Sequence, residues 1–254
     1  MNKSTLYIIG TGPGDPDLLT LKAYKKLQDC SILVAPKASR NGLSTALSIV
    51  NQAIDLSRKE VIEVHFPMKK IHLDRDIKSD VLIAWEDTAR KVLELMDTKG
   101  DVVFPTLGDP GIYSTGYYLY DTICSIRPEV NVKFIAGIPA MSSCSAAIST
   151  PVCLGDDKLA VIPATFSESK IRQTLIDFDA IILMKVHRVM DRICKILQET
   201  GLTHRAVYVE KAGMVDERII RDLTVAPANP HYFSTIIIRK REVRPASAFK
   251  ETRN

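Results

Sequence analysis

Gly10-Thr11-Gly12-Pro13-Gly14-Asp15-Pro16 follows the apolar run of residues 6–9, and Leu107-Gly108-Asp109-Pro110-Gly111 follows the apolar run of residues 102–104. Each glycine-rich turn comes directly after a short predicted strand. Open α/β sheets build their ligand sites at the carboxyl ends of such strands. The two turns therefore predict an α/β fold with its site along one edge of a sheet.

The first turn differs from a dinucleotide-binding fingerprint, although both are rich in glycine. Its spacing is G-x-G-x-G, and Asp15 at the start of the predicted helix would repel a pyrophosphate. The strand of residues 32–35 ends in Pro36 and Lys37, where the fingerprint needs an acidic residue for the ribose. These differences argue against NAD binding.

The composition is that of an ordinary globular protein, with 46% hydrophobic and 25% charged residues in a chain of 254. Its 34 Lys and Arg against 30 Asp and Glu give a net charge of +4, without a run of like charges. This mild charge argues against a nucleic-acid partner and is compatible with an acidic small substrate. Neither a signal peptide nor a membrane-spanning segment is expected from the apolar runs.

Cysteine and histidine spacing predicts no disulfide framework and no metal site. The five cysteines are widely spread and form no C-x-x-C pair, so we expect buried thiols in a reducing cytoplasm. The five histidines show no paired spacing typical of metal ligands.

Alternating strand and helix patterns predict two α/β domains, at residues 1–136 and 137–254. In the first, a mostly parallel sheet is expected, with a helix that begins at Asp15 and Pro16 and buries Leu18, Leu21, Tyr24 and Leu27. A longer helix over residues 75–98 is expected to bury Trp85. The second domain begins with a helix of small residues and offers five strands with fewer helices, which predicts a mixed sheet.

The landmarks of the sequence, in order, resemble those of the tetrapyrrole methylases. They are Gly10–Pro16 with Leu18–Lys22, Gly108-Asp109-Pro110, Gly137-Ile138-Pro139-Ala140, Met184 and Val209–Gly213. Within that family the chain is most similar to the branch that methylates C20 of precorrin-2 or cobalt-factor II. The stretches that carry this finer resemblance are His65–Met68, Val34–Lys37, Tyr113-Ser114-Thr115, Met184-Lys185-Val186, Tyr208–Met214 and Tyr232-Phe233-Ser234.

The resemblance implies a methyltransferase of cobalamin biosynthesis that uses S-adenosylmethionine in a cleft between two domains, in a homodimer. It also implies a first glycine loop that faces the substrate. Carried over position by position, the cofactor contacts would be Pro13, Leu107, Gly108, Asp109, Ile112, Pro139, Ala140, Met184 and Ala212.

The resemblance leaves the catalytic residue unassigned. Pro36 stands where the uroporphyrinogen methylases have an aspartate proposed as the general base. His65 and His187 are candidates to accept the proton that leaves C20, because histidine titrates near neutral pH. The substrate is a polycarboxylate, and Lys37, Arg40, Lys69 and Lys185 are candidates to bind it.

Two other functions stay open at this point. One is methylation at another macrocycle position or of a macromolecule, as in the diphthamide and ribosomal-RNA relatives. The other is a nucleotide-binding module without methyl transfer.

Overall fold

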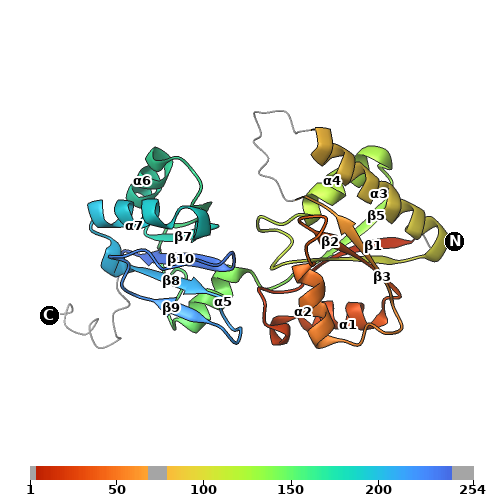
Figure 1. The fold of residues 1–254 in the computed structure, drawn as a ribbon, viewed down its shortest axis with the longest axis horizontal. Coiled ribbons are helices and arrows are strands. Elements are labelled where there is room, and N and C mark those ends of the chain that lie inside the picture. Colours follow the sequence, from red (N-terminus) through yellow and green to blue (C-terminus); the bar gives the residue numbers. More distant parts are fainter. Residues whose placement is uncertain (1–3, 68–78, 242–254) are drawn as a thin grey trace. The chain divides into compact units, whose positions relative to one another are not determined.

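The structure is a computed structural model that describes residues 4–67 and 79–241 of the chain. It divides into two compact units, Met1–Pro139 and Ala140–Asn254. The boundary expected after residue 136 falls just before this division. Each unit is built around its own five-stranded sheet, as Figure 1 shows.

The sheet of the first unit is parallel throughout, in the order β3-β2-β4-β1-β5. Its strands are β1 (Thr5–Gly10), β2 (Ile32–Lys37), β3 (Glu60–His65), β4 (Val102–Thr106) and β5 (Asn131–Ile135). This confirms the predicted parallel sheet. Because β1 and β4 are neighbours, the two glycine-rich turns that follow them lie at the same edge.

Helices cover both faces of this sheet (Figure 1). They are α1 (Leu21–Asp29), α2 (Thr45–Ala53), α3 (Ser79–Lys99) and α4 (Gly116–Ile126), with a short 3-10 helix, η1 (Pro16–Leu18), before α1. Ile8 of β1 is buried beneath α3 and α4, whereas its neighbour Ile9 is buried beneath α1 and α2. The alternation of side chains along a strand thus fills two apolar layers.

The helix expected from Asp15 to Leu27 is instead two helices, and the predicted burial of Leu21 is wrong. Asp15 caps η1 as expected, its Oδ1 accepting the Asp17 amide at 2.9 Å. Thr20 then caps α1 separately, which resets the helical phase. Ala23 and Leu27 become the buried positions, and Leu21 is 67% exposed.

Trp85 lies in the core, as predicted. Its ring stacks between Phe66, at a centroid distance of 5.6 Å, and Tyr118, at 5.1 Å. The indole N–H donates to the carbonyl of Pro67 at 3.2 Å, so the buried polar atom is satisfied. The expected residues 75–78 of this helix lie outside the described residues.

The sheet of the second unit is mixed, in the order β6-β7-β10-β8-β9. Its strands are β6 (Leu159–Pro163), β7 (Ala180–Met184), β8 (Ala206–Glu210), β9 (Arg218–Ile220) and β10 (Ser234–Arg239). Only β6 and β7 pair in parallel, which confirms the prediction. Helices α6 (Glu168–Asp177) and α7 (Met190–Glu199) cover one face and α5 (Ala140–Ala147) packs on the other; η2 (Val186–Arg188) and η3 (Thr203–Arg205) are short 3-10 helices.

The cysteines agree only in part with the expected buried thiols. Cys30, Cys144 and Cys194 are buried and Cys124 is half-buried, but Cys153 is exposed. Burial raises the pKa of the Cys144 thiol to about 11. Among residues 4–67 and 79–241, no helix combines the length and the apolar character needed to cross a membrane.

Candidate functional site

The two glycine-rich turns of the first unit are joined by backbone hydrogen bonds. The Gly108 amide donates to the Gly12 carbonyl at 2.8 Å, and the Gly12 amide donates to the Gly108 carbonyl at 3.2 Å. The Thr11 amide donates to the Thr106 carbonyl at 2.9 Å. Predicted site residues that are far apart in sequence are thus brought together at the carboxyl ends of β1 and β4.

Asp109 ties a third segment to this pair of turns. Its Oδ2 accepts the amide of Gly137 at 2.9 Å, and its Oδ1 accepts the amide of Gly111 at 2.8 Å. The Ile112 amide donates to the Asp109 carbonyl at 3.2 Å, which closes the turn expected for Gly-Asp-Pro. The carboxylate therefore has a structural role in holding Gly137, just before Pro139.

Glycine is required where these segments cross. A Cβ on Gly137 would lie 2.1 Å from the Gly108 carbonyl oxygen and 2.8 Å from the Gly10 Cα. A Cβ on Gly10 would lie 2.6 Å from the same carbonyl oxygen. Because all these neighbours are backbone atoms, no change of side-chain rotamer could relieve the contact.

Gly108 presents an open face beside this crowded crossing. Its φ of +71° is a conformation that favours glycine, and a Cβ there would meet nothing within 4 Å. A ligand could therefore approach the backbone at this point. Of the neighbouring predicted contacts, Pro13 is buried, and Leu107 and Ile112 are half-buried.

A hydroxyl cluster beneath the turn was not assigned a role by the sequence. Thr106 Oγ1 lies 2.8 Å from Ser114 Oγ and 3.5 Å from Thr115 Oγ1, and the Thr11 hydroxyl donates to the Thr106 carbonyl at 3.1 Å. The only signal was the concentration of Ser and Thr around Gly-Asp-Pro. The cluster satisfies buried hydroxyls and fixes the segment after the turn.

In the second unit, Met184 ends β7 and is half-buried. It pairs with Thr235 of β10, and its carbonyl accepts the Ala164 amide at 2.7 Å. Its side chain packs against the apolar cluster that also contains Ala212. Met184 therefore packs against the core. Because its residue is only partly buried, it remains accessible to a ligand. Ala140, the remaining predicted contact, is the half-buried first residue of α5.

Ala212 lies in a turn with left-handed backbone on both sides. Lys211 has a φ of 52° and Gly213 a φ of 78°. The Ala212 carbonyl accepts the Ser143 hydroxyl at 3.2 Å, and the Gly213 amide donates to Glu217 Oε2 at 2.7 Å. These bonds stabilise a left-handed backbone conformation that is unfavourable for a lysine.

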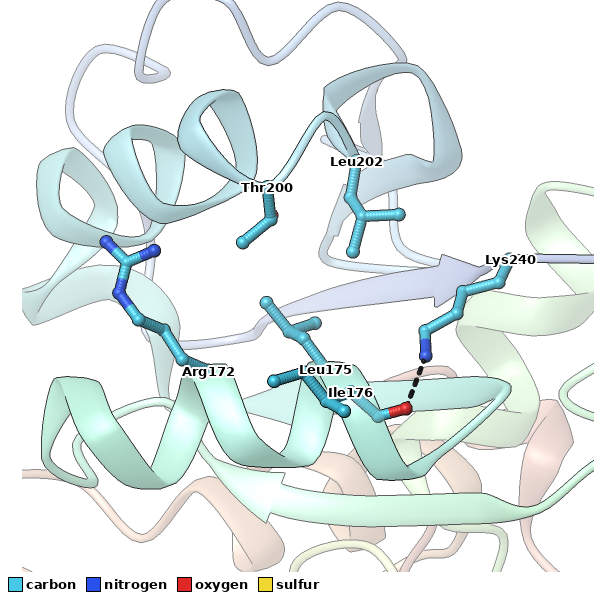
Figure 2. A pocket seen from close by; sticks show the side chains of 6 residues that line it. All are labelled: Arg172, Leu175, Ile176, Thr200, Leu202 and Lys240. Carbon is cyan, nitrogen blue, oxygen red and sulfur yellow. Dashed lines mark hydrogen bonds between the residues drawn. The ribbon is translucent and has the colours of Figure 1, made fainter.

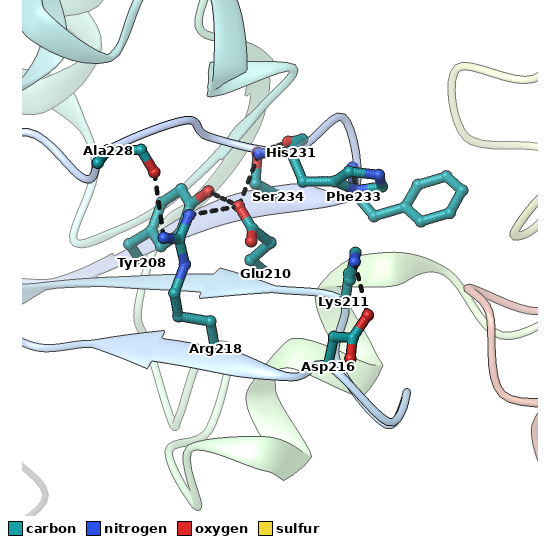
Figure 3. Close-up of polar contacts among 9 residues, drawn as sticks. All are labelled: Tyr208, Glu210, Lys211, Asp216, Arg218, Ala228, His231, Phe233 and Ser234. Atoms are coloured by element: carbon teal, nitrogen blue, oxygen red, sulfur yellow. Dashed lines mark hydrogen bonds and ion pairs between the residues drawn. The ribbon is translucent and has the colours of Figure 1, made fainter.

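Glu210, at the end of β8, carries a buried polar network that the sequence did not reveal (Figure 3). Its carboxylate accepts from the Tyr208 hydroxyl and from Arg218 Nη2, the latter at 2.9 Å. A glutamate after an apolar strand resembles a surface residue, so the sequence alone gives no sign of its burial.

Comparison with known proteins identifies the fold and the lineage. The sequence matches the profile of the Tetrapyrrole (Corrin/Porphyrin) Methylases over residues 5–226. This chain belongs to that family. It is 33% identical to the cobalt-precorrin-2 C(20)-methyltransferase of Salmonella typhimurium over 92% of this chain and 96% of that protein. It is 30% identical to the precorrin-2 C(20)-methyltransferase of a Sinorhizobium species, over 93% and 96%.

Solved structures confirm the two-sheet fold of this tetrapyrrole methylase. The methyltransferase CobJ matches with a TM-score of 0.69 at 17% identity, over 95% of this chain and 97% of CobJ. A uroporphyrin-III C-methyltransferase from Thermus thermophilus, complexed with S-adenosylhomocysteine, matches with a TM-score of 0.65 at 20% identity, over 93% and 97%. At these identities the likeness concerns the fold alone.

The two candidate histidines of this methylase differ in surroundings. His187, in η2, packs edge-on against Tyr232 at a centroid distance of 5.3 Å, and its Nδ1 is buried without a hydrogen-bond partner among the described residues. Burial, Arg188 and His231 lower the pKa of His187, so its ring is neutral at pH 7. His65 is the half-buried last residue of β3.

The candidate cations for the substrate carboxylates that the structure describes come from both units. Lys37 Nζ forms an ion pair with Glu63 at 3.1 Å, and Arg40 is exposed in the segment after β2. Lys185 is half-buried in left-handed conformation directly after Met184. Lys69 lies outside the described residues.

A pocket of about 350 Å³ in the second unit contains none of the predicted site residues (Figure 2). Leu175, Ile176 and Leu202 give it an apolar lining, and Lys240 Nζ donates to the Ile176 carbonyl at 3.0 Å. Arg172 at its rim is engaged by Glu168 and Glu199. We assign it no part in methyl transfer.

Proposed function

We propose that this protein transfers a methyl group from S-adenosylmethionine to C20 of precorrin-2 or of its cobalt-bearing counterpart. The observation that carries the proposal is the match, along nearly the whole chain, to two relatives that both bear the name of C20-methyltransferases. Which macrocycle is used, metal-free or cobalt-bearing, is decided by the experiment below.

The residues present fit the cofactor. The open face of Gly108 lies where the backbone can approach a ligand, and the hydrogen bonds of Asp109 and Gly12 hold that turn in place. We propose that Pro13, Leu107, Gly108, Asp109, Ile112 and Pro139 of the first unit bind it. Ala140, Met184 and Ala212 of the second unit complete the proposed set.

S-adenosylmethionine supplies a methyl group on a sulfonium, whose positive charge is lost on transfer. A site for it needs no donor to a departing oxygen, which agrees with the small, apolar and backbone groups at these positions. Both Asp109 oxygens already accept one amide each, and a carboxylate oxygen has a second lone pair for a further donor. Alignment of the attacking carbon is then the main demand on the protein.

Transfer to C20 also releases a proton from the macrocycle. A neutral His187, whose Nδ1 has no hydrogen-bond partner within residues 4–67 and 79–241, is a candidate to accept it, but no observation links this atom to C20. We therefore assign no general base. An electron-rich meso carbon makes orientation by the protein more important than a base.

The supporting proposals follow the family resemblance. We propose a homodimer that acts in the cytoplasm and has no membrane partner. The mild net charge of +4 argues against a nucleic-acid partner as well. Gel filtration against the mass of one 28.2 kDa chain tests the dimer.

The test of function is anaerobic incubation of the purified protein and S-adenosylmethionine with the metal-free and the cobalt-bearing macrocycle in parallel. We expect mass spectrometry to show the gain of one methyl group, and the faster substrate to be the natural one. Cofactor binding without transfer to either macrocycle would contradict the proposal. Labelling of elongation factor or ribosomal RNA instead would establish the macromolecular alternative.

A further inference from the structure

The polar network around Glu210 joins two segments that follow different strands (Figure 3). Glu210 Oε2 accepts from the Tyr208 hydroxyl, from Arg218 Nη2 at 2.9 Å and from the His231 amide at 2.6 Å. Tyr208 is fully buried and Glu210 is only 7% exposed. One carboxylate oxygen thus accepts hydrogen bonds from β8, from β9 and from the segment that leads into β10.

Further bonds extend the network along this segment. Arg218 Nη1 donates to the Ala228 carbonyl at 3.1 Å, and the Ser234 hydroxyl donates to the His231 carbonyl at 2.6 Å. The Lys211 amide then donates to the Phe233 carbonyl at 2.8 Å. The segment of residues 228–234 is therefore held against the residue that follows Glu210.

The same contacts fix the entry to the Ala212 turn. Lys211 lies directly between Glu210 and Ala212 and has left-handed backbone. A lysine keeps such a conformation only where its surroundings hold it there. The Phe233 carbonyl supplies part of that restraint, and Glu210 holds its segment through the His231 amide. The ion pair of Lys211 Nζ with Asp216 at 3.0 Å supplies another part.

The charge state of the network is well defined. Burial raises the pKa of Glu210, but the hydrogen bonds from Tyr208, His231 and Arg218 outweigh it, so the net pKa is lowered. Burial and the bond to Glu210 raise the pKa of Tyr208 to about 12. At neutral pH Glu210 is therefore a carboxylate and Tyr208 a hydrogen-bond donor.

We infer that Glu210 is a positioning residue, which sets the Lys211–Gly213 turn and through it the contact of Ala212 with S-adenosylmethionine. This inference rests on the proposed function. Glu210 itself is not assigned a contact with the cofactor or the substrate. Its effect on methyl transfer passes through the backbone of the turn.

The test compares two variants that each remove one buried carboxylate from the second unit. Glu210→Gln disrupts the network, and Asp157→Asn disrupts the buried pair in which Arg239 Nη2 lies 2.6 Å from Asp157. Ser234, paired with Glu210, begins β10 and Arg239 ends it, so the control acts at the other end of the strand. Tyr208→Phe removes a single donor and provides a milder variant.

S-adenosylhomocysteine affinity is measured by calorimetry well below the melting temperature of each variant, together with the KM for S-adenosylmethionine and kcat. Glu210 has no assigned contact with the cofactor, so only part of the lost hydrogen-bond energy should affect binding. We expect Glu210→Gln to weaken binding roughly tenfold and to raise KM in parallel. Tyr208→Phe should fall between this variant and the wild type. Asp157→Asn should bind as the wild type does, although it melts earlier.

Equal affinities for Glu210→Gln and Asp157→Asn, with a wild type that binds, would overturn the inference and leave the proposed function intact. A wild type that does not bind S-adenosylhomocysteine would overturn the proposed function and this inference with it.

Discussion

Gly108 offers the sharpest test of where the cofactor approaches the first unit. In Gly108→Ala, the new methyl group would enter the open space beside the Gly-Asp-Pro turn. Gly201 at the end of α7 is a matched control, because its φ of +68° is close to the +71° of Gly108 and a Cβ at either position meets nothing within 4 Å. The two substitutions therefore place a Cβ in backbone of similar φ.

The expected magnitudes follow from this match. A non-glycine residue in left-handed backbone costs about 1 kcal/mol or somewhat more, so each variant should melt a few degrees, roughly 2–4 °C, below the wild type. A methyl group forced against a ligand costs a further 1–3 kcal/mol or so, which is about a fivefold to 150-fold loss of affinity. Only Gly108→Ala should show this second effect.

The assay combines differential scanning fluorimetry with calorimetric titration of S-adenosylhomocysteine. We expect similar melting temperatures for the two variants and weaker binding in Gly108→Ala alone. Equal dissociation constants for Gly108→Ala, Gly201→Ala and the wild type would show that the cofactor does not approach the open face of Gly108.

Three further predictions concern stability. Gly137→Ala should lower the free energy of unfolding by about 3 kcal/mol, since its Cβ would meet only backbone atoms. Urea unfolding measures this loss. A loss below about 1 kcal/mol would contradict the close packing of Gly137 against Gly10 and Gly108. Trp85→Ala should lower the free energy of unfolding by about 3–5 kcal/mol in the same assay, because it leaves a cavity in the aromatic stack. A loss of about 0.5 kcal/mol or less, as for a surface residue, would contradict the burial of Trp85. The pKa of His187 is lowered, so as pH falls below 6.5 the unfolded chain is protonated first and the wild type loses stability. His187→Gln should lose less stability between pH 7.5 and 5.5, and an unchanged slope would contradict the lowered pKa.

Most strands of both sheets could be predicted because their apolar runs are short and end at glycine, proline or charged residues. The burial of Trp85 followed in the same way from helical periodicity. Strand β3 (Glu60–His65) was not predicted, because Glu60 and Glu63 interrupt its apolar run. Leu21 was misplaced because Thr20 begins a second helix, and a cap of this kind changes the phase of every following position. The capping hydrogen bond of Thr20 therefore determines where α1 begins, although the apolar periodicity favoured one longer helix.

The candidate site was predictable as a set of turns but not as a set of contacts. The bond from the Gly137 amide to Asp109 joins residues 28 positions apart, and only the fold brings their segments together. The burial of Glu210 depends on Arg218 and on a segment before β10, which no local pattern connects to it. Both are polar contacts between residues distant in sequence, and only the fold of the backbone determines which residues meet.

The most direct measurement is the position of the transferred methyl group. Reaction with S-adenosylmethionine labelled with carbon-13 in its methyl group, followed by NMR of the product, locates the new carbon on the macrocycle. We expect a single labelled methyl group at C20. A labelled methyl group at any other ring position would contradict the proposed function, although the chain would remain a tetrapyrrole methylase by sequence and fold.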